Sequence, residues 1–257
     1  MAIEAVRKYG KKNVVLLNHD ISPKVEHKDI KRFKRQIADY LDLDITYANH
    51  KEWETMTPNA LALKLNAFSS GRGDGFCTRE LKSKPFIKWL KKHYPSTDIS
   101  NLREDCIILY GFDADERSRI TRKVQGLAIH GYRTDFPLAL WQRTIHDTDE
   151  IGISKPATYA TWRHANCQGC HKAGRQHWYV VFCLRPDLWE ESKEAERIIG
   201  HSIIKNIYLE GLEAQFTEMR DIKGICPSEK IDSNKFWKLI RDTLPEQMSL
   251  LPCDCSY

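Results

Sequence analysis

The sequence predicts an α/β protein with a doubly wound, mostly parallel sheet, followed by a helical C-terminal region. Two observations carry this prediction. Compact apolar runs with strand character alternate with amphipathic segments of helical length over residues 13–116, and beyond residue 125 the pattern becomes mainly helical. We therefore expect an α/β core over residues 1–125 and a helical region over residues 126–257 that packs on it.

The N-terminal half is expected to alternate between strand and helix. The expected strands span residues 13–21, 44–49 and 105–116, and the expected helices span residues 28–41 and 80–94. The first strand, "NVVLLNHDI", is a continuous apolar run typical of a parallel strand that is buried on both faces. The first helix follows from Ile30, Phe33 and Ile37, which recur at helical spacing. In such sheets, ligands bind beyond the carboxyl ends of the strands.

The C-terminal half is expected to be mainly helical. The expected helices span residues 134–148, 185–200 and 234–243. Pro137 lies close to the start of the first, and Gly200 ends the second. The run "WYVVFCL" at 178–184 is ambiguous, because its β-branched and aromatic residues favour a strand while periodicity cannot separate that strand from a buried helix.

Composition limits the environment and the partners of the chain. The longest apolar run, at 178–184, is too short to span a bilayer, and the N-terminus lacks the apolar core of a secretory signal. We therefore expect a cytoplasmic protein with no membrane partner.

The charge is uneven along the chain. Residues 1–100 hold 19 Lys and Arg against 12 Asp and Glu, whereas the rest of the chain holds 21 against 23. A basic N-terminal half suits a phosphate-rich ligand or a nucleic acid, but the solvent-exposed face of an amphipathic helix explains the same charge.

The segment "RHANCQGCHKAGRQHW" at 163–178 is a candidate site for metal or redox chemistry. It places Cys167 and Cys170 in a C-x-x-C, a spacing compatible with zinc, an iron–sulfur cluster or thiol redox chemistry. Eight cysteines in a cytoplasmic chain favour such chemistry over disulfides, and buried thiols are the alternative. Two ligands are too few for a metal, so further donors must come from elsewhere. The other candidate donors are Cys226, Cys253, Cys255, His164 and His171.

Four motifs occur in order along the chain: "GFCTRELKSKPFIKWL" at 75–90, "LYGFDADERSR" at 109–119, "FPLALWQ" at 136–142 and "NCQGCHKA" at 166–173. Over roughly residues 1–200, the set resembles the phosphoadenosine phosphosulfate reductase-like branch of the PP-loop (adenine-nucleotide α-hydrolase) superfamily, in its bacterial and phage form. The resemblance implies a Rossmann-like sheet that binds an adenine nucleotide. It also implies sulfonucleotide reduction, or sulfur transfer to tRNA, DNA or a small molecule.

The resemblance also implies site residues. Cys77 joins Cys167 and Cys170 as a ligand of a [4Fe–4S] cluster, with zinc as the alternative metal and Cys226 as a candidate fourth ligand. Cys77 is in addition the candidate catalytic residue. The expected binding residues for ATP or a sulfonucleotide are Asn18, Asp20, Arg79, Lys82, Gly111, Glu116 and Arg119. Among them, the lysine and the arginines suit phosphate or sulfate, because arginine binds such groups with a bidentate fork.

Three departures from the family pattern limit this interpretation. The Ser-Gly-Gly-x-Asp-Ser pyrophosphate loop and its strand do not precede "MAIEAVRKYG", which resembles the helix that follows that loop. The C-terminal Glu-Cys-Gly-Leu-His motif of the reductases is absent, and Asp113 stands where the family has arginine. Two functions stay open: an enzyme of nucleotide-dependent sulfur transfer or reduction, acting on a nucleic-acid, protein or small-molecule substrate, or a non-catalytic nucleotide-binding or regulatory module with a structural zinc.

The missing strand has a structural consequence. The runs at 13–21 and 106–112 each need hydrogen-bonded neighbours, and the family places one strand between them. We therefore expect that these two strands do not belong to one complete sheet built from the family's remaining elements. Three arrangements satisfy this expectation: direct pairing of the two strands, insertion of "WYVVFCL" between them, or a strand supplied by a partner chain.

Overall fold

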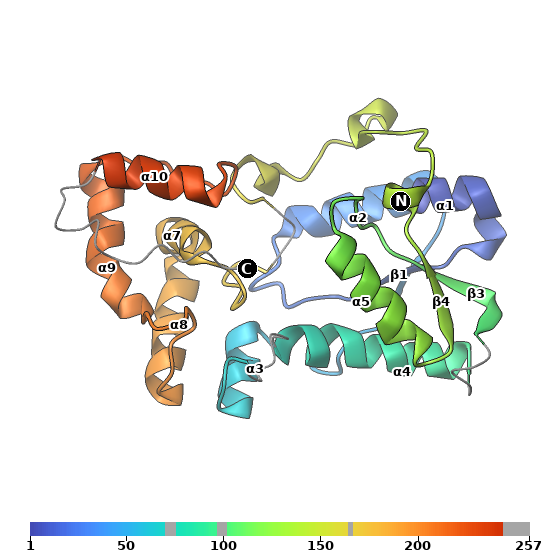
Figure 1. The fold of residues 1–257 in the computed structure, drawn as a ribbon, viewed down its shortest axis with the longest axis horizontal. Helices are drawn as coiled ribbons and strands as arrows, with labels where there is room; N and C mark the ends of the chain where they lie inside the picture. The colour runs from blue at the N-terminus through green and yellow to red at the C-terminus, as the bar shows by residue number, and fades with distance from the viewer. Residues whose placement is uncertain (70–75, 97–101, 164–166, 244–257) are drawn as a thin grey trace. The chain divides into compact units, whose positions relative to one another are not determined.

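The computed structural model describes residues 1–69, 76–96, 102–163 and 167–243, which form a mixed α/β protein with many helices and small parallel sheets (Figure 1). The chain divides into two compact units. Unit 1 comprises residues 1–19, 32–49 and 83–155, and unit 2 comprises residues 20–31, 50–82 and 156–257. Within the described residues, no helix is long and apolar enough to cross a membrane.

The expected single boundary near residue 125 differs from this division. The last segment of unit 1 continues to residue 155, and two early segments join the C-terminal unit. Packing explains both differences. Strand β4 (Tyr132–Asp135) pairs with β3 (Arg103–Leu109) and so stays with the α/β core, whereas helix α3 (Pro58–Leu65) packs against helix α8 (Pro186–Ile199) of the C-terminal region.

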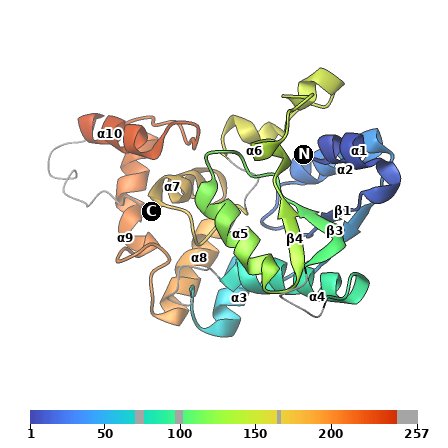
Figure 2. The same ribbon diagram turned by 45° about the vertical axis from the view of Figure 1, so that its right-hand side comes forward.

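Unit 1 contains two parallel strand pairs. Strand β1 (Leu16–Asn18) pairs with β2 (Ile45–Tyr47), and β3 pairs with β4. The helices of this unit are α1 (Ala2–Tyr9), most of α2 (Lys28–Leu41), α4 (Lys84–His93), α5 (Arg117–Ala128) and α6 (Pro137–Leu140), with short helical turns at Lys11–Asn13 and Thr148–Ile151. Helix α5 lies alongside β4 (Figure 2). The α/β alternation of the sequence, including the bounds of α2, is therefore confirmed.

The core of unit 1 lies between the helices and the β3–β4 pair. Leu90 of α4, Leu127 of α5 and Tyr132 of β4 are almost fully buried together. The Tyr132 hydroxyl donates to the Tyr94 carbonyl oxygen at 2.7 Å, so burial of this large side chain leaves no orphaned hydroxyl. This packing places the carboxyl ends of β3 and β4 at one edge of the unit.

The expectation that residues 13–21 and 106–112 do not share one complete sheet is confirmed for the described residues. β1 is hydrogen-bonded to β2 alone, and β3 to β4 alone. The two strands do not pair directly, and the segment 178–184 does not lie between them, because it is helical. A strand supplied by a partner chain stays a prediction.

The prediction of a helix over residues 134–148 is wrong for most of that range. Within that range the structure has the short helix α6, and Asp135 ends strand β4. Local hydrogen bonds explain the difference. The Asp135 carboxylate accepts from the Phe136 backbone N–H at 2.7 Å and from Trp141 Nε1 at 2.9 Å, which turns the chain after the strand and stops the helix within a single turn.

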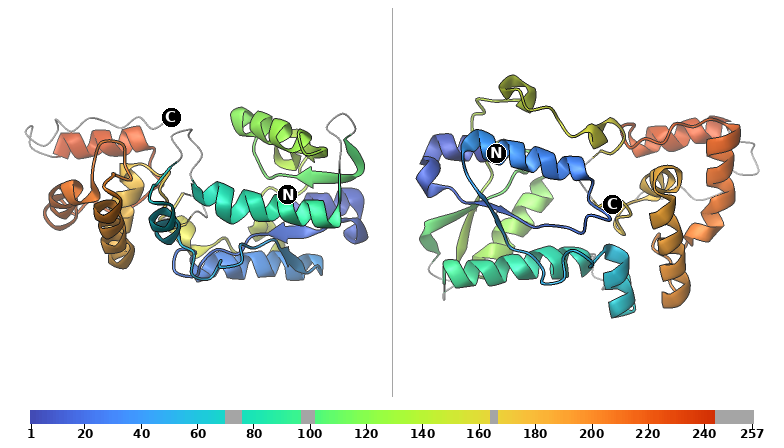
Figure 3. Two further views of the ribbon diagram at one scale, coloured as in Figure 1. Left: turned by 90° about the horizontal axis from the view of Figure 1, so that it is seen from below. Right: turned by 180° about the vertical axis from the view of Figure 1, so that it is seen from behind.

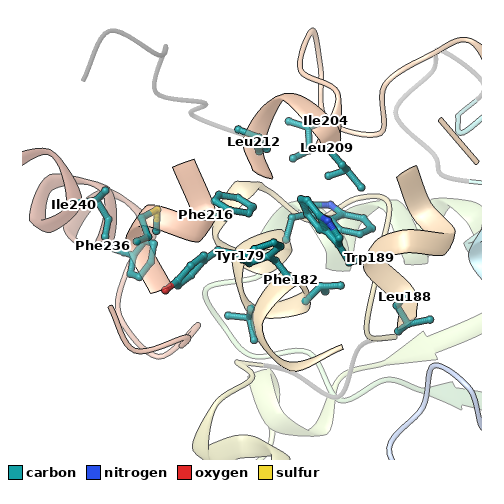
Figure 4. Close-up of a cluster of buried hydrophobic side chains, with 14 of the residues drawn as sticks. Tyr179, Phe182, Leu188, Trp189, Ile204, Leu209, Leu212, Phe216, Phe236 and Ile240 are labelled. Atoms are coloured by element: carbon teal, nitrogen blue, oxygen red, sulfur yellow. The ribbon is translucent and has the colours of Figure 1, made fainter. Parts of the chain in front are cut away.

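Unit 2 is built almost entirely of helices (Figures 1 and 3). Besides α3 and α8, they are α7 (Arg175–Leu184), α9 (Leu209–Thr217) and α10 (Ser233–Thr243), with helical turns at Thr78–Ser83 (η2), Ala157–Ala160 and Glu218–Ile222. Helices α7, α8 and α9 pack in succession around a core rich in aromatic side chains (Figure 4). The expected helices at 185–200 and 234–243 are confirmed as α8 and α10.

The run "WYVVFCL", which the sequence left ambiguous, forms the last seven residues of helix α7, so the helical alternative is correct and the strand alternative is wrong. Arg175 to Phe182 are all buried, which means that the helix is covered on nearly every side. A helix enclosed in this way carries apolar residues all round and therefore shows no amphipathic period in its sequence. Burial among α8, α9 and α10 overrides the β-propensity of its valines and aromatic residues.

Candidate functional site

Cys77 and the C-x-x-C share one neighbourhood in unit 2, although they are far apart in the sequence. The pKa of the Cys77 thiol is raised to about 12, first by burial and then by the neighbouring Cys170 and Cys167. Burial raises the pKa of Cys167 to about 11, and Cys170 acts in the same direction. Electrostatic effects of this kind weaken with distance, so the three thiols lie within electrostatic range of one another, a range wider than the spacing of ligands around a single metal ion.

Lys82 belongs to the same neighbourhood. It lies in the π-helical turn η2, which begins directly after Cys77, and it lowers the pKa of both Cys77 and Cys167. Burial outweighs this effect, so both thiols are neutral at pH 7. A neutral thiol is a poor nucleophile, so Cys77 as a free catalytic residue is disfavoured. A bound metal reverses the balance, because its positive charge deprotonates the thiols that ligate it.

The C-x-x-C turn is held in place by a histidine at the start of α7. The backbone N–H groups of Gly169 and Cys170 donate to His177 Nε2 at 3.2 and 3.1 Å. His177 Nδ1 lies 2.6 Å from Glu229 Oε1, so the proton sits on Nδ1 and the Nε2 lone pair faces the turn. Gly169 adopts a φ of +77°, a left-handed conformation that favours glycine. The turn therefore has one specified conformation.

His177 and Glu229 are residues of the candidate site that the sequence interpretation did not assign. The available signal was the polar trio of Arg175, Gln176 and His177 directly before the apolar part of α7, all three of which are buried. Buried polar side chains normally have specific hydrogen-bond partners, so such a trio indicates residues that hold neighbouring segments in place. Glu229, 52 residues further along the chain, carried no comparable signal.

We expect His177→Ala to destabilise the metal-free protein. The N–H groups of Gly169 and Cys170 lose their acceptor, and each buried group left unsatisfied costs about 1–3 kcal/mol. Urea denaturation followed by circular dichroism measures the change. His201→Ala is the control, because His201 is exposed. If His177→Ala has the same denaturation midpoint as this control, His177 does not stabilise the C-x-x-C turn as described.

His171, the residue after Cys170, is a second unusual histidine. Its Nε2 lies 2.7 Å from Asn59 Oδ1, and its ring packs edge-on against Phe68 with the ring centroids 5.0 Å apart. Burial lowers its pKa to about 4, so the imidazole is neutral. Its other nitrogen, Nδ1, is buried and has no hydrogen-bond partner among the described residues.

The remaining candidate donors are placed elsewhere or lie outside the described residues. Cys226 is exposed, and its electrostatic neighbours are Tyr179 and Cys183 in the later part of α7. It is therefore a poor candidate for the fourth position. Cys253, Cys255 and His164 lie outside the described residues. Cys106 is buried in β3, and Cys183 is half-buried against the helical core.

Four of the expected nucleotide-binding residues lie in unit 1. Asn18 ends β1, and its side-chain oxygen accepts from the His19 backbone N–H at 2.7 Å. Glu116 precedes α5 and forms an ion pair with Arg119, whose guanidinium also lies 4.3 Å from the centre of the Phe112 ring. Gly111 follows β3, where a Cβ atom would lie 3.4 Å from Met1 Sδ. The loop after β3 therefore carries polar side chains that already bind one another.

The other three expected nucleotide-binding residues lie in unit 2. Asp20 pairs with Lys31 at 3.1 Å, with both side chains largely buried, so its charge is already balanced within the protein. Arg79 pairs with the neighbouring Glu80 at 2.8 Å and is half exposed. Lys82 differs from both, because its described electrostatic neighbours are thiols. Of the two cations Arg79 and Lys82, Lys82 is therefore the better placed to act together with the cysteines.

A depression of about 420 Å³ lies on unit 1, and none of the expected site residues is among those that line it. It is lined by Glu4, Arg7, Lys8, Trp141 and Gln142. Lys8 lies 3.8 Å from the centre of the Trp141 ring, and the buried Glu4 carboxylate accepts from the Thr144 backbone N–H at 2.8 Å. These contacts tie α1 to the segment after α6, so the lining residues have a structural role.

The cysteine neighbourhood fits a multi-thiolate centre in its chemistry. Three thiols and an orphaned imidazole nitrogen make a donor set that zinc and iron–sulfur clusters prefer. Among the described residues, however, no three His, Cys, Asp or Glu side chains are placed to hold a single metal ion. An iron–sulfur cluster needs its ligands further apart than a single metal ion does, because the ligands bind different iron atoms.

No family model, curated protein or solved structure matches this chain.

Proposed function

We propose that this chain is a phosphoadenosine phosphosulfate reductase-like protein that binds an adenine nucleotide or sulfonucleotide and acts in sulfur transfer or reduction. We further propose that it carries a cysteine-ligated iron–sulfur cluster. The observation that carries the proposal is the neighbourhood shared by Cys77, Cys167, Cys170 and Lys82. It combines thiol ligands with a cation, as a centre that handles sulfur beside an anionic group requires.

The residues of the chain have distinct parts in this proposal. The three cysteines hold the cluster, which supplies a site for binding sulfur or for transferring electrons. Lys82 attracts the phosphate or sulfate end of the nucleotide and orients it toward the centre. The His177–Glu229 pair keeps the C-x-x-C turn in its binding conformation. Asn18, Gly111 and the Glu116–Arg119 pair line the carboxyl ends of the strands, where ligands of such sheets bind.

We also propose that the two strand pairs are parts of one Rossmann-like, doubly wound sheet. Both pairs are parallel and belong to unit 1, and they have the helix-connected order that such sheets use. The edges of β1 and β3 would then flank a further parallel strand. Such a strand satisfies backbone groups that otherwise depend on water.

Anaerobic purification followed by iron, sulfide and zinc analysis tests the metal part of the proposal. We expect iron and acid-labile sulfide together with the visible absorption of a cluster. Zinc without sulfide supports the non-catalytic module instead. That second candidate is favoured by one observation: Asp20, Arg79 and Arg119 already have ion-pair partners within the chain. Absence of all three elements contradicts both.

The nucleotide part is tested by calorimetry with ATP and with phosphoadenosine phosphosulfate. We expect Lys82→Ala and Arg119→Ala each to weaken binding by roughly 1–3 kcal/mol, the scale of a charge-assisted hydrogen bond. Lys12→Ala is the control, because Lys12 is an exposed lysine outside the proposed site. Unchanged affinity in both site variants rejects this placement of the nucleotide.

A further inference from the structure

Helix α4 of unit 1 carries four lysines along one side. Lys84 and Lys88 are four residues apart, and Lys91 and Lys92 lie three and four residues after Lys88, a spacing that groups side chains on one side of an α-helix. All four side chains are exposed, and α4 contains neither aspartate nor glutamate. Lys88, Lys91 and Lys92 form no ion pair with a carboxylate of the described residues. We call the four residues the lysine stripe.

The stability of the helix does not explain the lysine stripe. Like charges four residues apart repel one another and destabilise a helix, and only the lysines of the last turn gain from the helix dipole. Helix α8 shows a solvent-exposed face with both signs of charge. There, Lys193 pairs with Glu190, and Arg197 pairs with Glu194. A helix that breaks this local rule without a structural gain indicates a functional surface.

Helix α5 is equally free of acidic residues. It lies next to α4, because the two helices contribute to one buried cluster. Arg117 and Arg122 of α5 are exposed and have no ion-pair partner among the described residues. Glu116, directly before the helix, is already paired with Arg119. The two helices together hold eight lysines and arginines and no acidic residue, so the positive charge belongs to this part of unit 1 and not to α4 alone.

The packing of α4 argues against a membrane as the partner of the lysine stripe. Helices that bind a lipid surface bury an apolar face in it. The apolar face of α4 is already occupied, because Leu90 is buried and Phe86, Ile87 and Trp89 pack against the same cluster.

A protein partner is also disfavoured. Lysine is depleted at protein–protein interfaces, whose binding energy comes mainly from buried aromatic and arginine side chains. No large apolar side chain of α4 is exposed beside the lysines. Nucleic acid is the polyanion that cations alone can bind, through its phosphates.

We propose that the lysine stripe binds the phosphodiester backbone of a nucleic acid. Lysine contacts a phosphate as a mobile point charge, and such contacts position a nucleic acid without reading its sequence. The surplus of positive charge in residues 1–100, 19 Lys and Arg against 12 Asp and Glu, has the sign that this partner requires. The stripe contains none of the residues proposed to bind a metal or a nucleotide, so this inference goes beyond the proposed function and does not depend on it.

The test measures binding of the full chain to a fluorescently labelled DNA duplex and to a labelled single-stranded RNA, by fluorescence anisotropy over a salt series. We expect binding that weakens as salt rises, because each neutralised phosphate releases counterions. In the variant Lys88→Gln/Lys91→Gln/Lys92→Gln, the salt dependence on the duplex should fall by about 0.9 per lysine in log–log slope, and affinity should fall more than about tenfold at about 0.1 M salt. Arginine at the same three positions keeps the charge and is expected to keep the binding. The tighter of the two probes identifies the kind of nucleic acid.

The matched control is Lys205→Gln/Lys223→Gln/Lys238→Gln. It removes the same charge from three exposed lysines of unit 2 and is expected to bind as the unchanged chain does. Equal loss of affinity in this control would mean that net charge, and not the stripe, attracts the nucleic acid. Binding of neither probe by the unchanged chain overturns the proposal, as does tighter binding to vesicles of phosphatidylserine and phosphatidylcholine. Lys82 and Arg119 are unaltered in every variant, so failure here leaves the nucleotide and metal tests untouched.

Discussion

Serine in place of Cys77, Cys167 or Cys170 is expected to empty the proposed metal centre. Each substitution removes one of the thiolates that we propose as direct ligands of the metal. The loss in affinity should therefore exceed the roughly 10–100-fold that follows removal of an outer-shell partner. A serine hydroxyl does not compensate, because zinc and iron–sulfur clusters prefer the softer thiolate. Iron, sulfide and zinc content after anaerobic purification measures the effect.

The matched control for these variants is Cys226→Ser. Cys226 is exposed, and its neighbours are Tyr179 and Cys183, so its removal is expected to leave the metal content unchanged. Equal loss of metal in Cys226→Ser would place that residue in the centre after all. Retention of full metal content in all three site variants would show that these cysteines are buried thiols and not ligands.

Phe216→Ala is expected to destabilise unit 2 more than any surface substitution in it. The Phe216 side chain is fully buried, and its ring centre lies 5.3 Å from that of Tyr179 and 5.7 Å from those of Phe182 and Trp189 (Figure 4). Truncation to alanine removes these contacts and leaves a cavity that a close-packed core cannot fill. Substitutions of this kind cost about 3–5 kcal/mol.

The effect of Phe216→Ala is measured as the change in the free energy of unfolding by chemical denaturation. The dependence of that free energy on denaturant concentration is held the same for all variants. Phe216→Leu keeps most of the volume and should lose less stability. Ile222→Ala serves as the surface control, because Ile222 is 74% exposed, and it is expected to change stability by about 0.5 kcal/mol or less. Similar midpoints for Phe216→Ala and Ile222→Ala would mean that the aromatic cluster does not stabilise the fold as described.

The candidate site was visible in the sequence only in part. The C-x-x-C could be predicted because its spacing alone suits a metal, and Cys77 joined it through a family resemblance. The partners that shape the site could not be predicted. His177 meets Glu229, and His171 meets Asn59, across 52 and 112 residues of sequence. No local pattern relates such pairs, because their meeting depends on how α3, α7 and the segment after the helical turn at Glu218–Ile222 pack within unit 2.

The sequence by itself determined the elements whose signals are local. Helix α2 begins and ends where its apolar spacing predicted, and α8 ends at Gly200, which adopts the left-handed conformation that ends helices. Only the tertiary structure decided that "WYVVFCL" is helical, that residues 132–135 form a strand, and that β1 and β3 belong to separate pairs. Spacing and capping act within one or two helical turns, whereas enclosure of α7 and pairing of β4 depend on neighbours that are distant in the sequence.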